Sequence, residues 1–238
     1  MTGPERLIRF SRVVSLSHPI EPRMPHWPGD PPMEFSVWAE WERDGYFLRR
    51  FAVGEHGGTH VNAPLSFHPE GEAIDRMVPE TWVVPAVVID ICRQAEADAD
   101  HRLSLADVED WEARHGAVPA GSCVLLRTGW SRFWHDGEAY LNLDDQGRPR
   151  YPGYSPEAAR YLLETRAAAG LGTDTPGVDA GLDGAFSINR LVLERPRIVL
   201  ENLANLDRLP AVGATLVIGV LALKGGSGSP AAVTALLP

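Results

Sequence analysis

Two histidines four residues apart are the clearest candidates for chemistry in this sequence. His56 and His60 lie in the segment HGGTHVNAP, and His68 adds a third imidazole within 13 residues. A helix would place residues i and i+4 on one face, but two glycines and a β-branched threonine between the histidines disfavour a helix. A glycine-rich loop can turn both imidazoles toward one point, where a divalent metal would bind. The spacing predicts a metal site, with an ordinary hydrogen-bonded structural role as the alternative.

The elements before this segment are expected to be mostly strands. Residues 13–17 read as a short strand, and the proline-rich stretch 19–32 excludes regular structure. Residues 35–41 and 46–53 alternate in the manner of two strands, joined by a hairpin at 43–45. The second of these strands delivers the chain directly into the histidine segment.

Helices and strands alternate after residue 83. The strands are expected at 83–91, 122–127, 197–200 and 215–223, and the helices at 104–115, 155–169 and 189–194. Ser104 and Ser155 have the position of N-caps, while residues 173–176, reached through Gly170-Leu171-Gly172, and residues 225–230 read as turns. This order predicts an α/β fold with a mixed sheet, and no linker divides residues 1–238, so a single domain is expected.

Composition limits the classes of partner. The chain has 238 residues, 44% of them hydrophobic, and a formal net charge of −10. This charge argues against nucleic acid or an anionic membrane as a partner. Cys92 and Cys123 lie in apolar runs and are expected to be reduced, with a disulfide as the alternative. The polar residues 1–6 do not resemble a signal peptide, and no apolar run approaches a membrane span, so a cytoplasmic protein is expected.

The histidine segment resembles the HxGTHxDAPxH signature of the cyclase-like metal-dependent hydrolase family, to which bacterial kynurenine formamidase and isatin hydrolase belong. Four further segments resemble the family in the same order along nearly the whole chain. They are SLSHPI with MPHWPGD (15–30), GTDTPGVD (172–179), ENLANL (201–206) and GGSGSP (225–230). The resemblance implies the swivelling β/β/α fold of bacterial kynurenine formamidase, with its mixed sheet, and a homodimer or homotetramer.

The resemblance also implies a ligand set, from which this chain departs. In the family, the two histidines and the aspartate of the signature bind zinc or manganese, and the last histidine of the signature acts as acid and base. A later histidine and the glutamate of the ENL segment help to hold a second metal. This chain has Asn62 for the aspartate, Ser66 for the acid/base histidine and Asn189 for the later histidine, while Glu201 is retained.

These departures predict a site with one divalent metal ion, most simply zinc or manganese. His56 and His60 are the expected ligands, and Asn62, Glu201 and His68 are the candidates for a further one. Asparagine oxygen is a weak zinc ligand but acceptable for harder cations. The acid/base role is expected to move to His68, because residues i and i+2 of an extended segment share a side, or to Glu201. Ser66 could bind substrate or, with an adjacent base, act as nucleophile.

The expected function is metal-dependent hydrolysis of a small-molecule amide, lactam or lactone. Three further residues are candidates for contact with the substrate: Trp27, which resembles a family aromatic near the pocket, Asn189, and Thr128, which follows a buried strand. Arg127 is expected in a structural salt bridge. Two alternatives stay open, namely a non-hydrolytic cyclase, dehydratase or isomerase that uses the metal as Lewis acid, and a ligand-binding protein without turnover.

Overall fold

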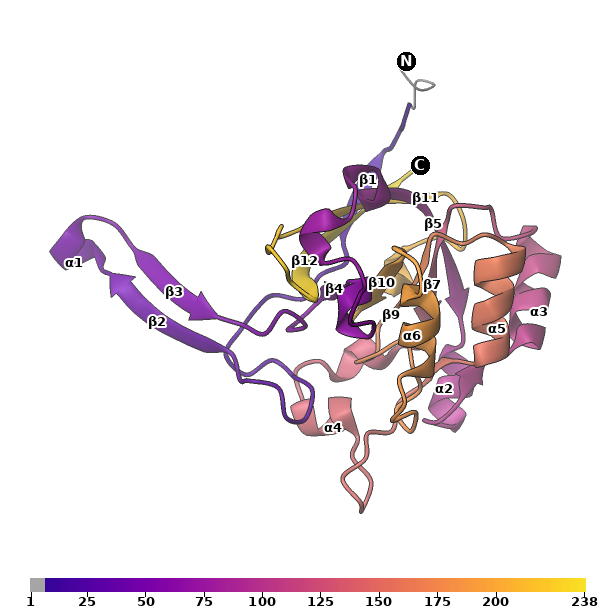
Figure 1. Cartoon of the computed structure of the whole chain (residues 1–238), viewed down its shortest axis with the longest axis horizontal. Coiled ribbons are helices and arrows are strands. Elements are labelled where there is room, and N and C mark those ends of the chain that lie inside the picture. The colour runs from indigo at the N-terminus through magenta and orange to yellow at the C-terminus, as the bar shows by residue number, and fades with distance from the viewer. Residues whose placement is uncertain (1–6) are drawn as a thin grey trace.

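Eight strands form one sheet that curls into a barrel-like shape (Figure 1). The computed structural model describes residues 7–238, apart from the side chains of residues 79 and 80, so the polar N-terminal residues 1–6 lie outside it. The strand order is β1-β12-β11-β5-β7-β9-β10-β4, and an additional pairing of β12 with β4 joins the two sides of the sheet. The sheet strands are Arg12–Ser15 (β1), His60–Asn62 (β4), Val83–Asp90 (β5), Cys123–Arg127 (β7), Gly170–Thr173 (β9), Ile198–Glu201 (β10), Ala214–Val220 (β11) and Gly228–Leu237 (β12).

The sheet is mixed, as the sequence predicts. Strands β5, β7, β9 and β10 are parallel, while β1, β4, β11 and β12 pair antiparallel with their neighbours. Helices cover the parallel half on its outer side (Figure 1). The helices are Trp41–Asp44 (α1), Cys92–Ala97 (α2), Leu105–His115 (α3), Gly137–Leu141 (α4), Pro156–Arg160 (α5), which continues as a π-helix over Tyr161–Thr165, and Ser187–Leu193 (α6).

Two apolar cores lie on the two sides of the sheet. The inner core fills the barrel with side chains such as Val61, Leu125 and Leu200, all fully buried. The outer core lies between the parallel strands and the helices, and includes Val124 and Trp111. Strands that are buried on both faces carry continuous apolar runs, which is why β5 and β7 were recognisable in the sequence.

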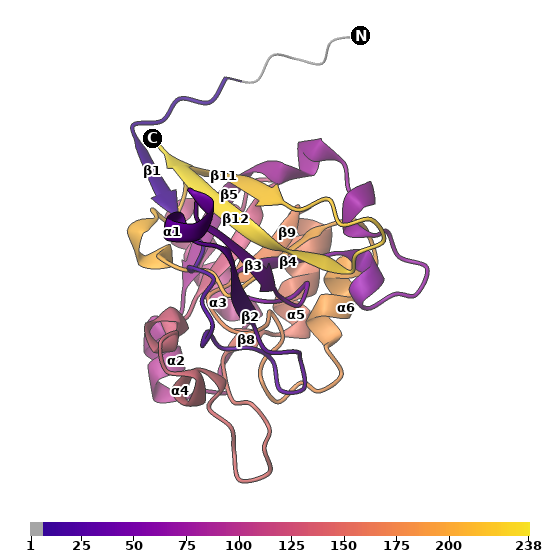
Figure 2. The same ribbon diagram turned by 90° about the vertical axis from the view of Figure 1, so that its left-hand side faces the viewer.

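Two pairs of short strands lie outside the barrel sheet. Glu34–Ala39 (β2) and Leu48–Ala52 (β3) form a two-stranded ribbon that projects from the body, with α1 at its tip (Figures 1 and 2). Arg102–Leu103 (β6) and Gly153–Tyr154 (β8) form a second small sheet. The predicted hairpin at 43–45 is therefore present, although its turn contains one turn of helix.

Ser104 caps α3, as predicted, and Asp107 adds a second cap bond that was not predicted. Ser104 accepts from the backbone N–H of Asp107, and the Asp107 carboxylate accepts from the backbone N–H of Ser104, which is a capping box. Two predictions about single side chains are also confirmed. Arg127 forms a salt bridge, with Asp90, and Cys92 and Cys123 are both free. None of the helices within residues 7–238 is long and apolar enough to cross a membrane.

Three strands contradict the sequence prediction. No strand is predicted for residues 170–172, which lead into the predicted turn 173–176, but Gly170–Thr173 forms β9, a central strand of the sheet. The predicted turn over 225–230 ends inside β12. Both segments are rich in glycine, GLGT at 170–173 and GGSGSP at 225–230, and glycine has low strand propensity. In β9 the glycine has a packing reason, because a Cβ atom on Gly170 would overlap the carbonyl oxygen of Ile198 in β10. The third is β4, which lies inside the supposed glycine-rich loop.

The close approach of β9 to β10 predicts that Gly170→Ala destabilises the protein. The new methyl group must push two buried parallel strands apart, which we expect to lower the free energy of unfolding by about 2 kcal/mol. Urea unfolding followed by circular dichroism measures the loss. Gly184→Ala is the matched control, because a Cβ atom there meets nothing within 4 Å. Equal stability of the two variants would contradict the proposed packing.

Candidate active site

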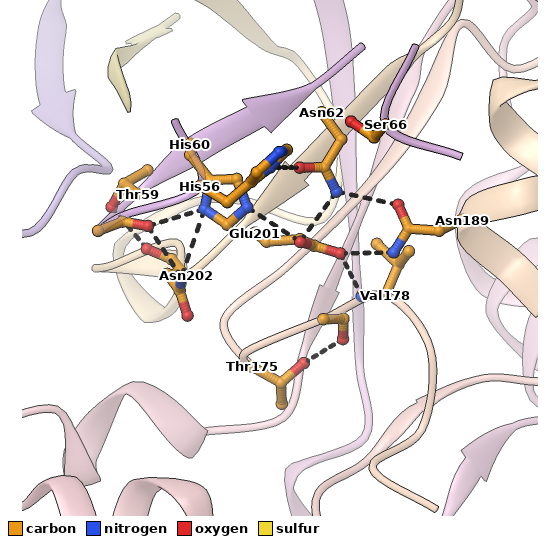
Figure 3. Close-up of polar contacts among 12 residues, drawn as sticks. His56, Thr59, His60, Asn62, Ser66, Thr175, Val178, Asn189, Glu201 and Asn202 are labelled. Carbon is orange, nitrogen blue, oxygen red and sulfur yellow. Dashed lines mark hydrogen bonds and ion pairs between the residues drawn. The ribbon is translucent and has the colours of Figure 1, made fainter. Parts of the chain in front are cut away.

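Sheet register brings the histidine segment against Glu201. In β4, His60 pairs with Glu201 of β10 on one side and with Pro230 of β12 on the other. His60 and Asn62 alternate along the strand with Val61, so both point out of the barrel core while Val61 points into it. The two side chains therefore lie over the carboxylate of Glu201 (Figure 3).

Four groups lie within hydrogen-bond distance of the buried carboxylate of Glu201. Oε2 lies 3.1 Å from Nε2 of His60 and 3.0 Å from Nδ2 of Asn62. Oε1 accepts from Nδ2 of Asn189 at 2.9 Å and from the backbone N–H of Val178 at 3.0 Å. A buried charge is costly unless it is paired and hydrogen-bonded, and this set of partners meets that requirement.

The two asparagines extend this network. Nδ2 of Asn62 also donates to Oδ1 of Asn189 at 3.0 Å, and Nδ2 of Asn189 also donates to Oδ2 of Asp179 at 2.9 Å. Oδ1 of Asn62 therefore faces the other way, 2.7 Å from Nδ1 of His56. Because both amides are fixed by several partners, their N–H groups point at the carboxylates of Glu201 and Asp179 (Figure 3 shows the contacts to Glu201).

Glu201 and Asp179 have pKa values displaced in opposite directions. Burial would raise the pKa of Glu201, but the bonds from His60, Asn189 and the backbone outweigh it, so the pKa lies below its usual range. Burial dominates at Asp179 and raises its pKa to about 7, against the bonds from Asn189 and the N–H of Ile188. Two carboxyl groups in one site thus have different protonation behaviour near neutral pH.

His56 is held from both sides of its ring. Nδ1 contacts Asn62, and Nε2 lies 2.9 Å from Oγ of Ser227, which also contacts the carboxylate of Glu55. Gly228 is required here, since a Cβ atom at that position would lie 2.6 Å from Cε1 of His56. Burial and the neighbouring imidazole of His60 lower the pKa of His56, so the ring is neutral at physiological pH.

A cavity of about 240 Å³ opens above these polar groups. Four aromatic side chains form a connected wall: Phe186 lies 5.9 Å from Trp27 and 5.5 Å from Phe67 between ring centroids, and Trp27 lies 6.4 Å from Tyr151. Fourteen residues line the cavity, and none of them is lysine or arginine. The cavity thus combines an aromatic wall with a floor that carries carboxylates, amides and imidazoles, which suits a small planar molecule.

Most of the predicted site residues come together in this cavity. His56, His60, Asn62, Asn189 and Glu201 all line it, and so do Trp27 and Ser66, the latter with its hydroxyl bonded to the carbonyl of Ser227.

Two candidate residues lie elsewhere. His68 was expected beside the site on an extended segment, but Pro64–Ser66 is a 3₁₀ turn. His68 instead bonds to the carbonyl of Arg190, outside the cavity lining. Thr128 is fully buried and binds the carboxylate of Asp174, so its role is structural. Of the two predicted acid/base candidates, Glu201 alone lines the cavity.

Several residues of the site were not identified from the sequence. Ser227 lies in the closing GGSGSP segment, which was recognised as a motif but given no role. Tyr151, Phe67 and Phe186 carry no local signal, because their approach depends on tertiary packing. Phe186 has a backbone φ of 54°, an unusual conformation for a large side chain and one that periodicity cannot predict.

The two imidazoles are close enough to share one divalent cation. The rings of His56 and His60 are 5.3 Å apart and nearly perpendicular. Two imidazole nitrogens bound tetrahedrally at about 2.1 Å would place the ring centres about 5 Å apart. Nδ1 of His60 bonds to the carbonyl of Gly58 at 2.9 Å, which directs the Nε2 lone pair at the carboxylate of Glu201. A proton or a cation must lie between these two acceptors.

A second cation does not fit. The N–H groups of Asn62 and Asn189 are directed at Glu201, and amide nitrogen does not bind metals while it carries these protons. Within residues 7–238, no three side chains of His, Cys, Asp and Glu cluster as a metal site. For a single ion, the remaining candidates for a third protein donor are the amide oxygen of Asn62, beside His56, and the carboxylate of Glu201, beside His60.

The chain is similar to known proteins over almost its full length. The Cyclase family matches residues 14–180. Isatin hydrolase of Roseibium aggregatum is 33% identical over all of this chain and 94% of its own length. This chain belongs to the cyclase family. Kynurenine formamidase of Bacillus cereus is 25% identical over 94% of this chain and 96% of its own length.

The solved structures confirm the predicted fold and family. Isatin hydrolase A from Ralstonia solanacearum has a TM-score of 0.90 and 34% identity, over 95% of this chain and 92% of its own. An isatin hydrolase bound to the product analogue thioisatinate has a TM-score of 0.88 and 33% identity, over 95% of this chain and 92% of its own. These relatives are hydrolytic enzymes, and this chain is a cyclase-family enzyme with their mixed α/β, barrel-like fold.

The orientation of the Asn62 amide predicts that Asn62→Asp makes the protein depend on metal. The new carboxylate would face Glu201 and Asn189 Oδ1 without the present N–H donor, so we expect a melting temperature about 5 °C lower in EDTA. Mn²⁺ or Zn²⁺ should then raise the variant's melting temperature more than the wild type's. Thermal unfolding with and without metal tests both effects. Gln146→Glu, at an exposed position, is the control. Identical metal responses of N62D and wild type would contradict the assigned geometry.

The raised pKa of Asp179 predicts a loss of stability as pH rises. Between the unfolded pKa near 4 and the folded pKa of about 7, the native state holds a proton that the unfolded state has lost. Stability from this group is therefore present at low pH and disappears as pH rises through about 7. Relative to Asp179→Asn, the wild type should lose about 2 kcal/mol of unfolding free energy between pH 5 and pH 8. Urea unfolding at both pH values measures the difference, and a constant difference would refute the assignment.

Proposed function

We propose that this protein hydrolyses a small aromatic amide, lactam or lactone. The observation that carries the proposal is the ionised Glu201 carboxylate, held by four polar groups at the floor of an aromatic-walled cavity beside His56 and His60. The family relationship to isatin hydrolase, whose named substrate is a lactam, supports this reaction class. The aromatic wall would hold the planar part of the substrate, and its acyl carbon would lie over the polar floor.

In this proposal Glu201 acts as the general base and Asp179 as the general acid. Glu201 is ionised at neutral pH and accepts a proton from the attacking water. Asp179, with a pKa of about 7, is partly protonated under the same conditions and supplies a proton for the leaving nitrogen or oxygen. Asn189 contacts both groups and keeps them in one network. Ser66 bonds to a backbone carbonyl and has no adjacent base, so a serine nucleophile finds no support.

One divalent cation, zinc or manganese, belongs to the proposal. His56, His60 and the amide oxygen of Asn62 would hold it, and it would supply Lewis-acid chemistry at the substrate carbonyl. Since Asn62 contributes no charge, binding should be weaker than at a site with an aspartate in this position.

Turnover with model substrates in ¹⁸O-labelled water tests the reaction. Isatin, an aryl formamide and an aryl lactone are suitable probes, each assayed with Mn²⁺ and with Zn²⁺. We expect hydrolysis of at least one, with one solvent oxygen in the new carboxyl group, and a kcat reduced about 100-fold or more in Glu201→Gln. Glu109→Gln, at an exposed position of α3, is the matched control and should retain activity.

The same experiment separates the alternatives. Conversion of a probe without incorporation of solvent oxygen would replace hydrolysis by a cyclase, dehydratase or isomerase reaction. Binding of the probes without conversion under either metal would support a ligand-binding protein and overturn the proposal.

A further inference from the structure

The closing GGSGSP segment places a hydroxyl group between His56 and a carboxylate. Oγ of Ser227 lies 2.9 Å from Nε2 of His56 and 2.7 Å from Oε2 of Glu55. The backbone N–H of Ser227 donates to the same oxygen of Glu55 at 2.7 Å. Glycines on both sides of the serine permit this approach. A Cβ atom on Gly226 would lie 3.1 Å from Oε1 of Glu55, and one on Gly228 would lie 2.6 Å from Cε1 of the imidazole.

The amide oxygen of Asn62 lies on the other side of the imidazole. Oδ1 of Asn62 is 2.7 Å from Nδ1 of His56 (Figure 3). The amide cannot turn its N–H groups toward the ring without placing its oxygen against the carboxylate of Glu201, to which Nδ2 donates at 3.0 Å. The imidazole therefore faces an oxygen that accepts protons and offers none.

These groups form a chain that holds one proton fewer than its contacts require. The chain runs from the carboxylate through the hydroxyl and the imidazole to the amide oxygen, with three contacts between neighbours. A hydroxyl carries one proton and a neutral imidazole carries one on a ring nitrogen, whereas an ionised carboxylate and an amide oxygen carry none. Two protons must therefore serve three contacts, and one pair of acceptors has no proton between them.

The charge of Glu55 decides which contact lacks the proton. A hydrogen bond to an ionised group is roughly twice as strong as one between neutral groups. The Ser227 hydroxyl therefore donates to Glu55, and its oxygen accepts the proton on Nε2 of His56. Nδ1 of His56 is left with a lone pair that faces the amide oxygen of Asn62 at 2.7 Å. Two acceptors at this distance repel each other unless a cation binds both.

We propose that Glu55 and Ser227 are positioning residues that fix His56 as the Nε2–H tautomer and so direct Nδ1 at a divalent cation. His60 has the opposite arrangement, because its Nδ1 bonds to a backbone carbonyl and its Nε2 carries the lone pair. The two histidines then present different ring nitrogens, each fixed by a hydrogen bond at the other nitrogen. This role rests on the proposed function for its cation, but the tautomer can be measured without metal and without turnover.

The protonated ring nitrogen of His56 tests the proposal directly. Two-bond ¹H–¹⁵N correlation spectra of the metal-free protein at about pH 8, where an imidazole is ordinarily neutral, identify it. The His56 signals are those missing in His56→Ala. We expect Nε2–H in the wild type and Nδ1–H in Glu55→Gln and in Ser227→Ala, because either change frees Nδ1 to donate to Asn62. Nδ1–H or a doubly protonated ring in the wild type, or an unchanged tautomer in either variant, would overturn the proposal.

Cation affinity tests the consequence of this tautomer. Isothermal titration calorimetry with Mn²⁺ and with Zn²⁺ should give a dissociation constant raised about 10-fold or more in Glu55→Gln. Glu72→Gln, at an exposed position outside the cavity lining, is the matched control and should bind as the wild type does. Ser227→Ala should weaken binding by a similar factor. The double variant should lose little more than either single variant, because both residues act through one chain of contacts.

Stability in the absence of metal separates positioning from misfolding. Glu55→Gln should have a melting temperature no lower than the wild type, because a hydrogen bond between His56 and Asn62 replaces their repulsion. A lower melting temperature, or wild-type affinity for both ions, would contradict the assigned role. A wild-type protein that binds neither ion would overturn this role together with the cation of the proposed function. Absence of hydrolysis, with the expected tautomers and affinities, would contradict the proposed function alone.

Discussion

The carboxylate of Glu201 is the charge around which the site is organised. A carboxylate removed from water must be surrounded by donors, and its four partners come from different parts of the chain. His60 and Asn62 belong to β4, Asn189 to α6, and Val178 to the loop after β9. Strand β4 has only three residues, yet it pairs with both β10 and β12 and so joins the two sides of the barrel. The polar network and the closure of the sheet therefore depend on the same short segment.

Charge balance explains why two amides lie beside this carboxylate. Glu201 and Asp179 are both buried and approach the same amide of Asn189, and a further anion at position 62 would repel both. The Asn62 amide instead offers N–H donors to one side and an oxygen to the other. The proximity of Glu201 contributes to the raised pKa of Asp179, although burial is the larger cause. A single positive charge between His60 and Glu201, proton or metal, completes the arrangement.

The sequence predicted the parts of the site that local pattern determines. Spacing and glycines identified His56 and His60, and the motif resemblance added Asn62, Asn189 and Glu201. It did not predict that His60 and Glu201 would be direct cross-strand partners, because β4 is hidden in a glycine-rich segment. Long apolar strands and capped helices were found, whereas β9 and β12 were missed because packing, not propensity, selects their glycines and alanines. The aromatic wall depends on tertiary contacts between distant loops, for which no local signal exists.

This chain has the shape of the isatin hydrolases, while its polar site departs from the family signature at positions where the backbone need not change. Asparagine and aspartate have nearly the same volume, so replacing one by the other leaves the backbone and the packing unchanged. What changes is the direction of one hydrogen bond, since an acceptor oxygen becomes an N–H donor. At position 62 that donor points to Glu201 and Asn189. At position 189, where the resemblance implies a histidine, the amide points to Glu201 and Asp179. A TM-score of 0.90 is insensitive to such a reversal. The chemistry of this member therefore depends on the orientation of two amides within a retained scaffold, and cation affinity is the property in which it should differ most from members that carry the aspartate.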